Sequence, residues 1–200
     1  MAVTLNASTS SGFVSTADTS GTVEIQSNGT TKLTVSSSGV NIGQMNGGAI
    51  TSGTAVSASS TSVDFTSIPS WVKRVTVMYS NVSTSGSSNF LVQVGSGSFT
   101  TSGYTGQANS GAGISGNSAG WIVCNNIGSG SNHIGAVTIL SFGSNIYIQT
   151  GLVGSATNSA SMSTSEGAVT LGGVLDRVRV TTVNGTDTFD AGSINILYEG

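Results

Sequence analysis

The stretch VLDRVRVTTVNGTDTFDAGSINILY, residues 174–198, decides the fold class of this chain. Valines alternate with arginines over residues 177–180, and three large apolar residues share one face of a second run, 194–198. Alternation with a period of two is the pattern of a half-buried β-strand. Asn184-Gly185 lies between the two runs, and this dipeptide signals a hairpin because both central residues of a type I′ turn need positive φ. The stretch therefore predicts two strands joined as a hairpin.

Short apolar runs of the same kind, bounded by Gly, Ser or Asn, extend back to about residue 54. The longest, Trp71–Tyr79, is partly apolar on both faces, so we expect it inside a two-layer structure or at a subunit contact. Gly95–Gly120 is expected to be a long loop. About eight or nine short strands with almost no helix predict an all-β domain, a β-sandwich of jelly-roll-like character. The predicted strands are Val63–Phe65, Trp71–Tyr79, Phe90–Val94, Trp121–Cys124, Ala136–Phe142, Asn145–Val153, Ala168–Leu171, Val174–Val183 and Ser193–Tyr198.

The first 50 residues form a separate and smaller unit. Asn28-Gly29 joins two short alternating runs, which predicts a hairpin, and Val40–Ile42 follows as a third run. The few apolar side chains of these strands cannot offset the backbone entropy lost on ordering them. We therefore predict an N-terminal attachment and oligomerisation segment over residues 1–50, packed on other chains or on the main domain. A Gly-rich linker, residues 43–53, leads to the β-sandwich domain over 54–200.

Composition excludes several classes of protein. Only 6% of the 200 residues are charged, whereas an average soluble domain has roughly 25%. Five basic residues are too few for a nucleic-acid footprint, and no apolar run approaches a membrane span of about 18 residues. No secretory signal is visible. A hydrophobic fraction of 36%, arranged in clusters, argues against disorder of the whole chain. A surface with so few charges fits a subunit of an assembly.

The sequence contains few side chains of the types that catalyse reactions. His133 and Cys124 are the only histidine and cysteine, so no metal-ligand spacing exists and no intrachain disulfide is possible. Cys124 lies in an apolar run and is interpreted as a small core residue. Asp187 and Asp190 flank Phe189 and are interpreted as turn and cap residues. We predict that the chain is not an enzyme and binds no metal or cofactor.

Two polar groups of residues are candidates for contact with a glycan, because sugar sites combine an aromatic platform with planar polar side chains. Both groups lie in stretches with a loop-like composition, and the alternative interpretation is that they form turns. The candidate glycan-contact residues are Tyr104, Gln107 and Asn109 in the first group, and Asn125, Asn126, Asn132 and His133 in the second.

Three segments, Phe13–Thr30, Phe65–Val77 and Asp176–Tyr198, resemble parts of fibre-like structural proteins of tailed bacteriophages. They are similar to the N-terminal segment of those proteins, to the opening of their C-terminal domain and to its closing strands. The resemblance implies a homotrimeric tail fibre or similar appendage of the virion, made in the host cytoplasm. Its N-terminal segment would contact other virion structural proteins, and its C-terminal domain would project toward a host surface glycan or protein.

Two other functions stay open at the level of sequence. The chain lacks the extended repetitive shaft of a long fibre, which leaves room for a short fibre, a head fibre or a capsid decoration protein. A free-standing carbohydrate-binding module is the third reading. Such a module should be monomeric and should not need residues 1–50. The resemblance carries over no catalytic or ligand-binding residue.

Overall fold

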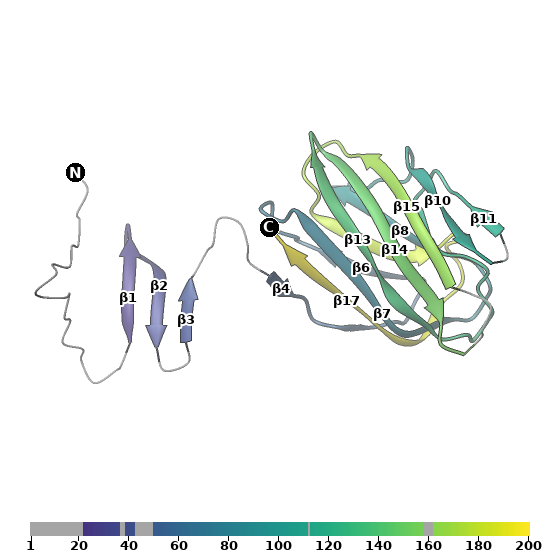
Figure 1. Cartoon of the computed structure of the whole chain (residues 1–200), viewed down its shortest axis with the longest axis horizontal. Helices are drawn as coiled ribbons and strands as arrows, with labels where there is room; N and C mark the ends of the chain where they lie inside the picture. The colour runs from purple at the N-terminus through teal and green to yellow at the C-terminus, as the bar shows by residue number, and fades with distance from the viewer. Residues whose placement is uncertain (1–21, 37–38, 43–49, 112, 158–161) are drawn as a thin grey trace, which may run out of the picture. The chain divides into compact units, whose positions relative to one another are not determined.

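The structure is a computed structural model that describes residues 22–36, 39–42, 50–111, 113–157 and 162–200 (Figure 1). Within these ranges it is built from antiparallel β-strands and contains no helix, so the predicted all-β class is confirmed. The chain divides into two compact units, Met1–Asn46 and Gly47–Gly200.

The N-terminal unit is a three-stranded sheet of β1 (Val23–Ser27), β2 (Thr30–Ser36) and β3 (Gly39–Ile42), in that order. Asn28 and Gly29 both have positive φ, 51° and 72°, as a type I′ turn requires. The predicted hairpin and the predicted third strand are therefore confirmed.

The second unit is a β-sandwich of two antiparallel sheets. The larger sheet comprises β4 (Ile50–Ser52), β5 (Val56–Ser57), β7 (Arg74–Thr84), β10 (Thr105–Ser110), β11 (Gly113–Ser115), β13 (His133–Gly143), β14 (Ile146–Ser155), β15 (Met162–Thr170) and β17 (Phe189–Glu199). Its strand order is β11-β10-β15-β14-β13-β7-β17-β4, and β5 also pairs with β17. The smaller sheet comprises β6 (Ser62–Thr66), β8 (Phe90–Ser96), β9 (Ser98–Phe99), β12 (Trp121–Cys124) and β16 (Arg177–Thr182). Its strand order is β12-β8-β16-β6, and β9 pairs with β8.

One hydrophobic core fills the space between the two sheets. Each long strand contributes alternate residues, as in β16, where Val178 and Val180 are fully buried. Phe90 of β8 lies near the centre of this core. Its ring stacks on Tyr79 of β7 with centroids 6.1 Å apart and contacts Phe189 of β17 at 5.7 Å, which ties the smaller sheet to the larger one.

The observed strand β7 begins at Arg74, three residues later than predicted, because Pro69 sets a turn before it. The amide of Val72 donates to the Pro69 carbonyl at 3.1 Å, and Trp71 lies in this turn. The Trp71 ring is half-buried and packs edge-on against Tyr198, 6.2 Å between centroids.

The expectation of a long loop over Gly95–Gly120 is wrong, because β9, β10 and β11 lie within it. Strand β10 pairs with β15, placing Gln107 opposite Glu166 and Asn109 opposite Thr164. These strands carry few large apolar residues, so the alternation that indicates a strand is weak in both. For the same reason only the last part of β15, near Ala168, was predicted.

The hairpin predicted at Asn184-Gly185 is also wrong. The dipeptide does form a turn, with Gly185 at φ 67° and its amide donating to the Thr182 carbonyl at 3.0 Å. However, β16 belongs to the smaller sheet and β17 to the larger one. The turn therefore carries the chain from one layer of the sandwich to the other. Similarly, Ile50–Ser52 of the predicted linker is a strand that pairs with β17.

Candidate functional site

The three-stranded N-terminal sheet has one apolar and one polar face. Its register places Val23 opposite Val35 and Ile25 opposite Leu33. Directly paired residues of an antiparallel sheet project to the same side, so these four side chains share a face. Val23 is 45% exposed, Ile25 53% and Val35 40%. The register with β3 continues both rows, since Val35 pairs with Val40 and Leu33 with Ile42.

The opposite face of this sheet is held by polar side chains. The Glu24 carboxylate accepts hydrogen bonds from Gln26 Nε2 and from the Thr31 hydroxyl, both at 3.1 Å. These groups are exposed and satisfied at the sheet surface. The sheet is thus amphipathic, and taken by itself it leaves its apolar side largely in water, which costs free energy in proportion to the exposed apolar area.

Tyr104 is not an exposed aromatic platform, because only 4% of it is accessible. Its hydroxyl accepts from the Val94 amide at 2.8 Å and lies 3.1 Å from the carbonyl oxygens of Val94 and Thr100. Its ring meets Trp121 edge-on, 5.1 Å between centroids. Burial raises the pKa of Tyr104 to about 12. The side chain holds β8 in place, which corrects the prediction of a glycan contact.

Asn125 and His133 are also buried, contrary to the prediction that they face a glycan. Asn125 donates through Nδ2 to the Gly113 carbonyl at 2.9 Å and accepts at Oδ1 from the Ser163 hydroxyl at 3.0 Å. His133 is fully buried, with Nδ1 3.2 Å from the Val82 carbonyl oxygen. Burial lowers the pKa of His133. Both residues join strands within the sandwich.

The other predicted glycan contacts lie at the surface but on separate elements. Gln107 and Asn109 are exposed side chains on β10. Asn132 precedes β13, where its amide donates to the Thr157 hydroxyl at 3.3 Å, and Asn126 follows β12 with φ 57°. In the described part of the chain, no hydrogen bond joins these side chains into a single site.

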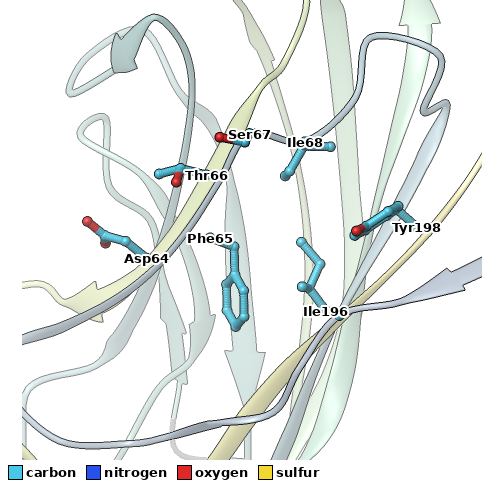
Figure 2. A pocket seen from close by; sticks show the side chains of 8 residues that line it. Asp64, Phe65, Thr66, Ser67, Ile68, Ile196 and Tyr198 are labelled. Atoms are coloured by element: carbon cyan, nitrogen blue, oxygen red, sulfur yellow. The ribbon is translucent and has the colours of Figure 1, made fainter.

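A cleft of about 240 Å³ lies between β6 of the smaller sheet and β17 of the larger (Figure 2). Ile68, Ile196 and Tyr198 line it on one side, whereas the Asp64 side chain points away from them. The Asp64 carboxylate instead receives two hydrogen bonds of 2.7 Å from Arg179. The cleft therefore presents apolar side chains and hydroxyls, with no free acid or base directed into it.

Arg179 belongs to a charged strip on the outer face of the smaller sheet. Its guanidinium lies 4.1 Å from the centre of the Phe99 ring, a cation–π distance. Arg177 lies over the same ring at 5.7 Å and pairs with Asp176, and its hydrogen bond lowers the pKa of that carboxyl. With Asp64 included, each arginine of the strip has its own carboxylate. The strip is neutral and is no basic patch.

Cys124 has the environment of a core residue, as predicted. Its thiol is fully buried, and burial raises its pKa to about 11. The nearest polar neighbours are the Ser163 hydroxyl and the Val153 carbonyl oxygen, each 3.8 Å from Sγ. Burial outweighs the hydrogen bond from Ser163, so the thiolate that a nucleophile needs is disfavoured.

Asp187 holds a turn together, as interpreted from the sequence, whereas Asp190 lies in β17 and joins this strand to β7, which corrects the interpretation of Asp190 as a turn or cap residue. Asp187 accepts from the Ser88 amide at 2.9 Å and from Asn184 Nδ2 at 2.7 Å, and the latter bond lowers its pKa. Asp190 accepts from the Ser83 hydroxyl. Over the described ranges, no group of three or more His, Cys, Asp or Glu is placed to hold a metal ion. None of the residues described forms a helix able to cross a bilayer.

The apolar outer face of the larger sheet was not predicted from the sequence. Leu140, Ile148 and Leu152 project from it with 38%, 37% and 46% of their surface exposed. A sequence pattern that could have predicted this face is present, because β13 and β14 have apolar residues at both odd and even positions. A strand that is apolar on both faces needs partners on both.

No family model, curated protein or solved structure matches this chain.

Proposed function

We propose that the chain is a structural subunit of a tailed-bacteriophage appendage, a tail fibre or a similar short fibre, assembled as a homotrimer. The apolar face of the N-terminal sheet carries this proposal. Val23, Ile25 and Val35 are between 40% and 53% exposed on this sheet, and their two cross-strand rows fit a surface that closes against other copies. The N-terminal unit is then an assembly and attachment element rather than an independent domain.

The placement of the resembling segments supports the same function. Phe65–Val77 and Asp176–Tyr198 are about 100 residues apart in the chain. In the sandwich they adjoin in both layers, because β6 pairs with β16 and β7 pairs with β17. Segments that carry one resemblance thus form one two-layer substructure, as expected if they belong to one structural module.

The chemistry of the interior favours a structural role over catalysis. Cys124 and His133, the residues most suited to chemistry, are fully buried. The arginines of the smaller sheet are engaged by carboxylates. A subunit that works by shape and self-assembly requires none of these groups to be free.

Localisation on the virion tests the proposal. Antibody raised against the purified chain should label the tail region of intact phage particles in electron micrographs. Label distributed over the capsid would instead identify a head fibre or decoration protein. Absence of the chain from purified particles, together with a monomeric state in solution, would contradict the proposal and favour a free-standing module.

A further inference from the structure

The outer face of the larger sheet carries an ordered pattern of apolar and threonine side chains. One cross-strand row runs from Leu152 through Ala136 to Met78, and the strand register aligns these residues across β14, β13 and β7. A parallel row contains Ala168, Ile148 and Leu140 on β15, β14 and β13. Figure 1 shows the strands that carry both rows side by side.

A row of threonines lies between the two apolar rows. Thr150 pairs with Thr138, and Thr138 pairs with Thr76, so three hydroxyl side chains align across β14, β13 and β7. Of the charges near these rows, Arg74 and Glu199 form an ion pair with each other. Glu166, opposite Thr150 on β15, is the charge left at the margin. Depletion of charged side chains is typical of the centre of a protein interface.

The face is large enough for a stable contact between subunits. Strands β7, β13, β14 and β15 are 9 to 11 residues long. With about 3.3 Å per residue and about 4.8 Å per strand, together with β17 they span about 800 Å² of sheet. A stable interface buries about 800 Å² per partner.

We propose that this face packs against the same domain of neighbouring copies of this chain, as a second self-association surface in addition to the N-terminal sheet. The inference deepens the proposed function, since it names the surface through which the C-terminal domains of the assembly meet. A second copy fits because it brings the same face, on which Arg74 and Glu199 pair with each other and Glu166 lies at the margin, so neither side desolvates an unpaired charge at the centre. The threonine hydroxyls satisfy one another or water in the contact.

Charged substitutions test the surface in the full-length chain. Ile148→Glu with Leu152→Glu places two carboxylates in the contact and should weaken it at least about 100-fold, because unpaired charges are costly to bury. The matched control is Val174→Glu with Val183→Glu, at positions 47% and 41% exposed but outside this face. Circular dichroism and melting of each variant check that the sandwich has folded.

Combining these changes with disruption of the N-terminal sheet separates the two surfaces. In a full chain with Ile25→Glu and Val35→Glu, self-association should persist in sedimentation at about 100 μM and vanish when Ile148→Glu and Leu152→Glu are added. A monomer with the N-terminal changes alone overturns the second surface and leaves the proposed function intact. An unchanged trimer with those changes contradicts the N-terminal surface and supports the sheet face.

A cysteine cross-link gives a second readout that does not depend on weakening the contact. The native Cys124 is the only cysteine and is fully buried, so an added thiol is the reactive one. Thr150→Cys, in the centre of the face, should form cross-linked pairs with a short bismaleimide. Thr186→Cys, an exposed position in the β16–β17 turn, is the control and should not. Equal cross-linking of both variants, or none of Thr150→Cys, overturns the proposal.

Discussion

At the scale of single residues, close packing decides which positions accept a side chain. Gly167 of β15 is buried under the Trp121 ring. A Cβ at this position would lie 2.4 Å from Trp121 Cδ1 and 2.4 Å from the Thr105 carbonyl oxygen. Neither atom belongs to a flexible chain end, so neither can move away cheaply.

Gly167→Ala is therefore expected to lower the free energy of unfolding by about 1–3 kcal/mol, the usual cost of overpacking. Chemical denaturation of the full chain measures it. Gly172→Ala is the matched control, since its Cβ would meet nothing within 4 Å, and it should change stability by no more than about 0.5 kcal/mol. Equal effects of the two substitutions would contradict the packing of Trp121 on β15.

Because His133 is buried, the stability of the fold is expected to decrease at acidic pH. Its pKa is lowered by burial in the folded state, so the unfolded chain takes up the proton first as the pH falls. Stability should be constant above about pH 7 and should decrease below about 6.5, with a slope of at most about 1.4 kcal/mol per pH unit. Because the chain has one histidine, His133→Phe should remove this slope between about pH 7 and 5.

The measurement is denaturation at a series of pH values, and the slope rather than the absolute stability is the readout. A wild-type chain whose stability does not change over this range, or a His133→Phe variant that keeps the slope, would show that another group titrates.

The burial of single side chains was only partly predictable from the sequence. Cys124 was correctly placed in the core because it belongs to a continuous apolar run. Tyr104 was wrongly expected at the surface, since it lies in a Gly-rich stretch without alternation. Its partners are the Trp121 ring and the backbone of Val94 and Thr100, and Trp121 is distant from Tyr104 in the sequence. Local composition contains no information about that partner.

At the scale of elements, two identical dipeptides form different turns. Asn28-Gly29 closes the β1–β2 hairpin with positive φ at both residues. At Asn184-Gly185 only Gly185 has positive φ, and the chain leaves its sheet. The neighbours of β16 are β6 and β8, whose residues lie far earlier in the chain, and they occupy both edges that β17 would need. The topology is therefore set by the pairing of β16 with strands from distant parts of the sequence, and not by the turn residues.

Both turns nevertheless require glycine, and this provides a test of the division into two units. Gly185→Val forces a β-branched residue to φ 67° and should cost about 1–2 kcal/mol, or about 2–8 °C in the main melting transition. Gly29→Val, at φ 72°, should disturb the N-terminal sheet and leave that transition within about 1 °C of wild type. Calorimetry of the full chain distinguishes the two. Equal shifts would mean that the units unfold together.

At the scale of the whole molecule, the two units differ in how much of their apolar surface they bury. The sandwich buries one core between its sheets, whereas the N-terminal sheet leaves Val23, Ile25 and Val35 about half exposed. The sequence predicted this contrast, because the number of large apolar residues is enough to judge whether a core can form. The apolar outer face of β13 and β14 was not predicted, since alternation alone cannot tell an inner face from an interface.

The mass of the purified full-length chain in solution tests the proposed self-assembly most directly. Sedimentation equilibrium at micromolar concentration should give three times the 19.8 kDa mass of one chain, and Ile25→Glu with Val35→Glu should lower the association constant. A wild-type chain that sediments as a 19.8 kDa monomer, with β1 to β3 protected from hydrogen exchange, would contradict the proposal that other copies cover the apolar face of the N-terminal sheet.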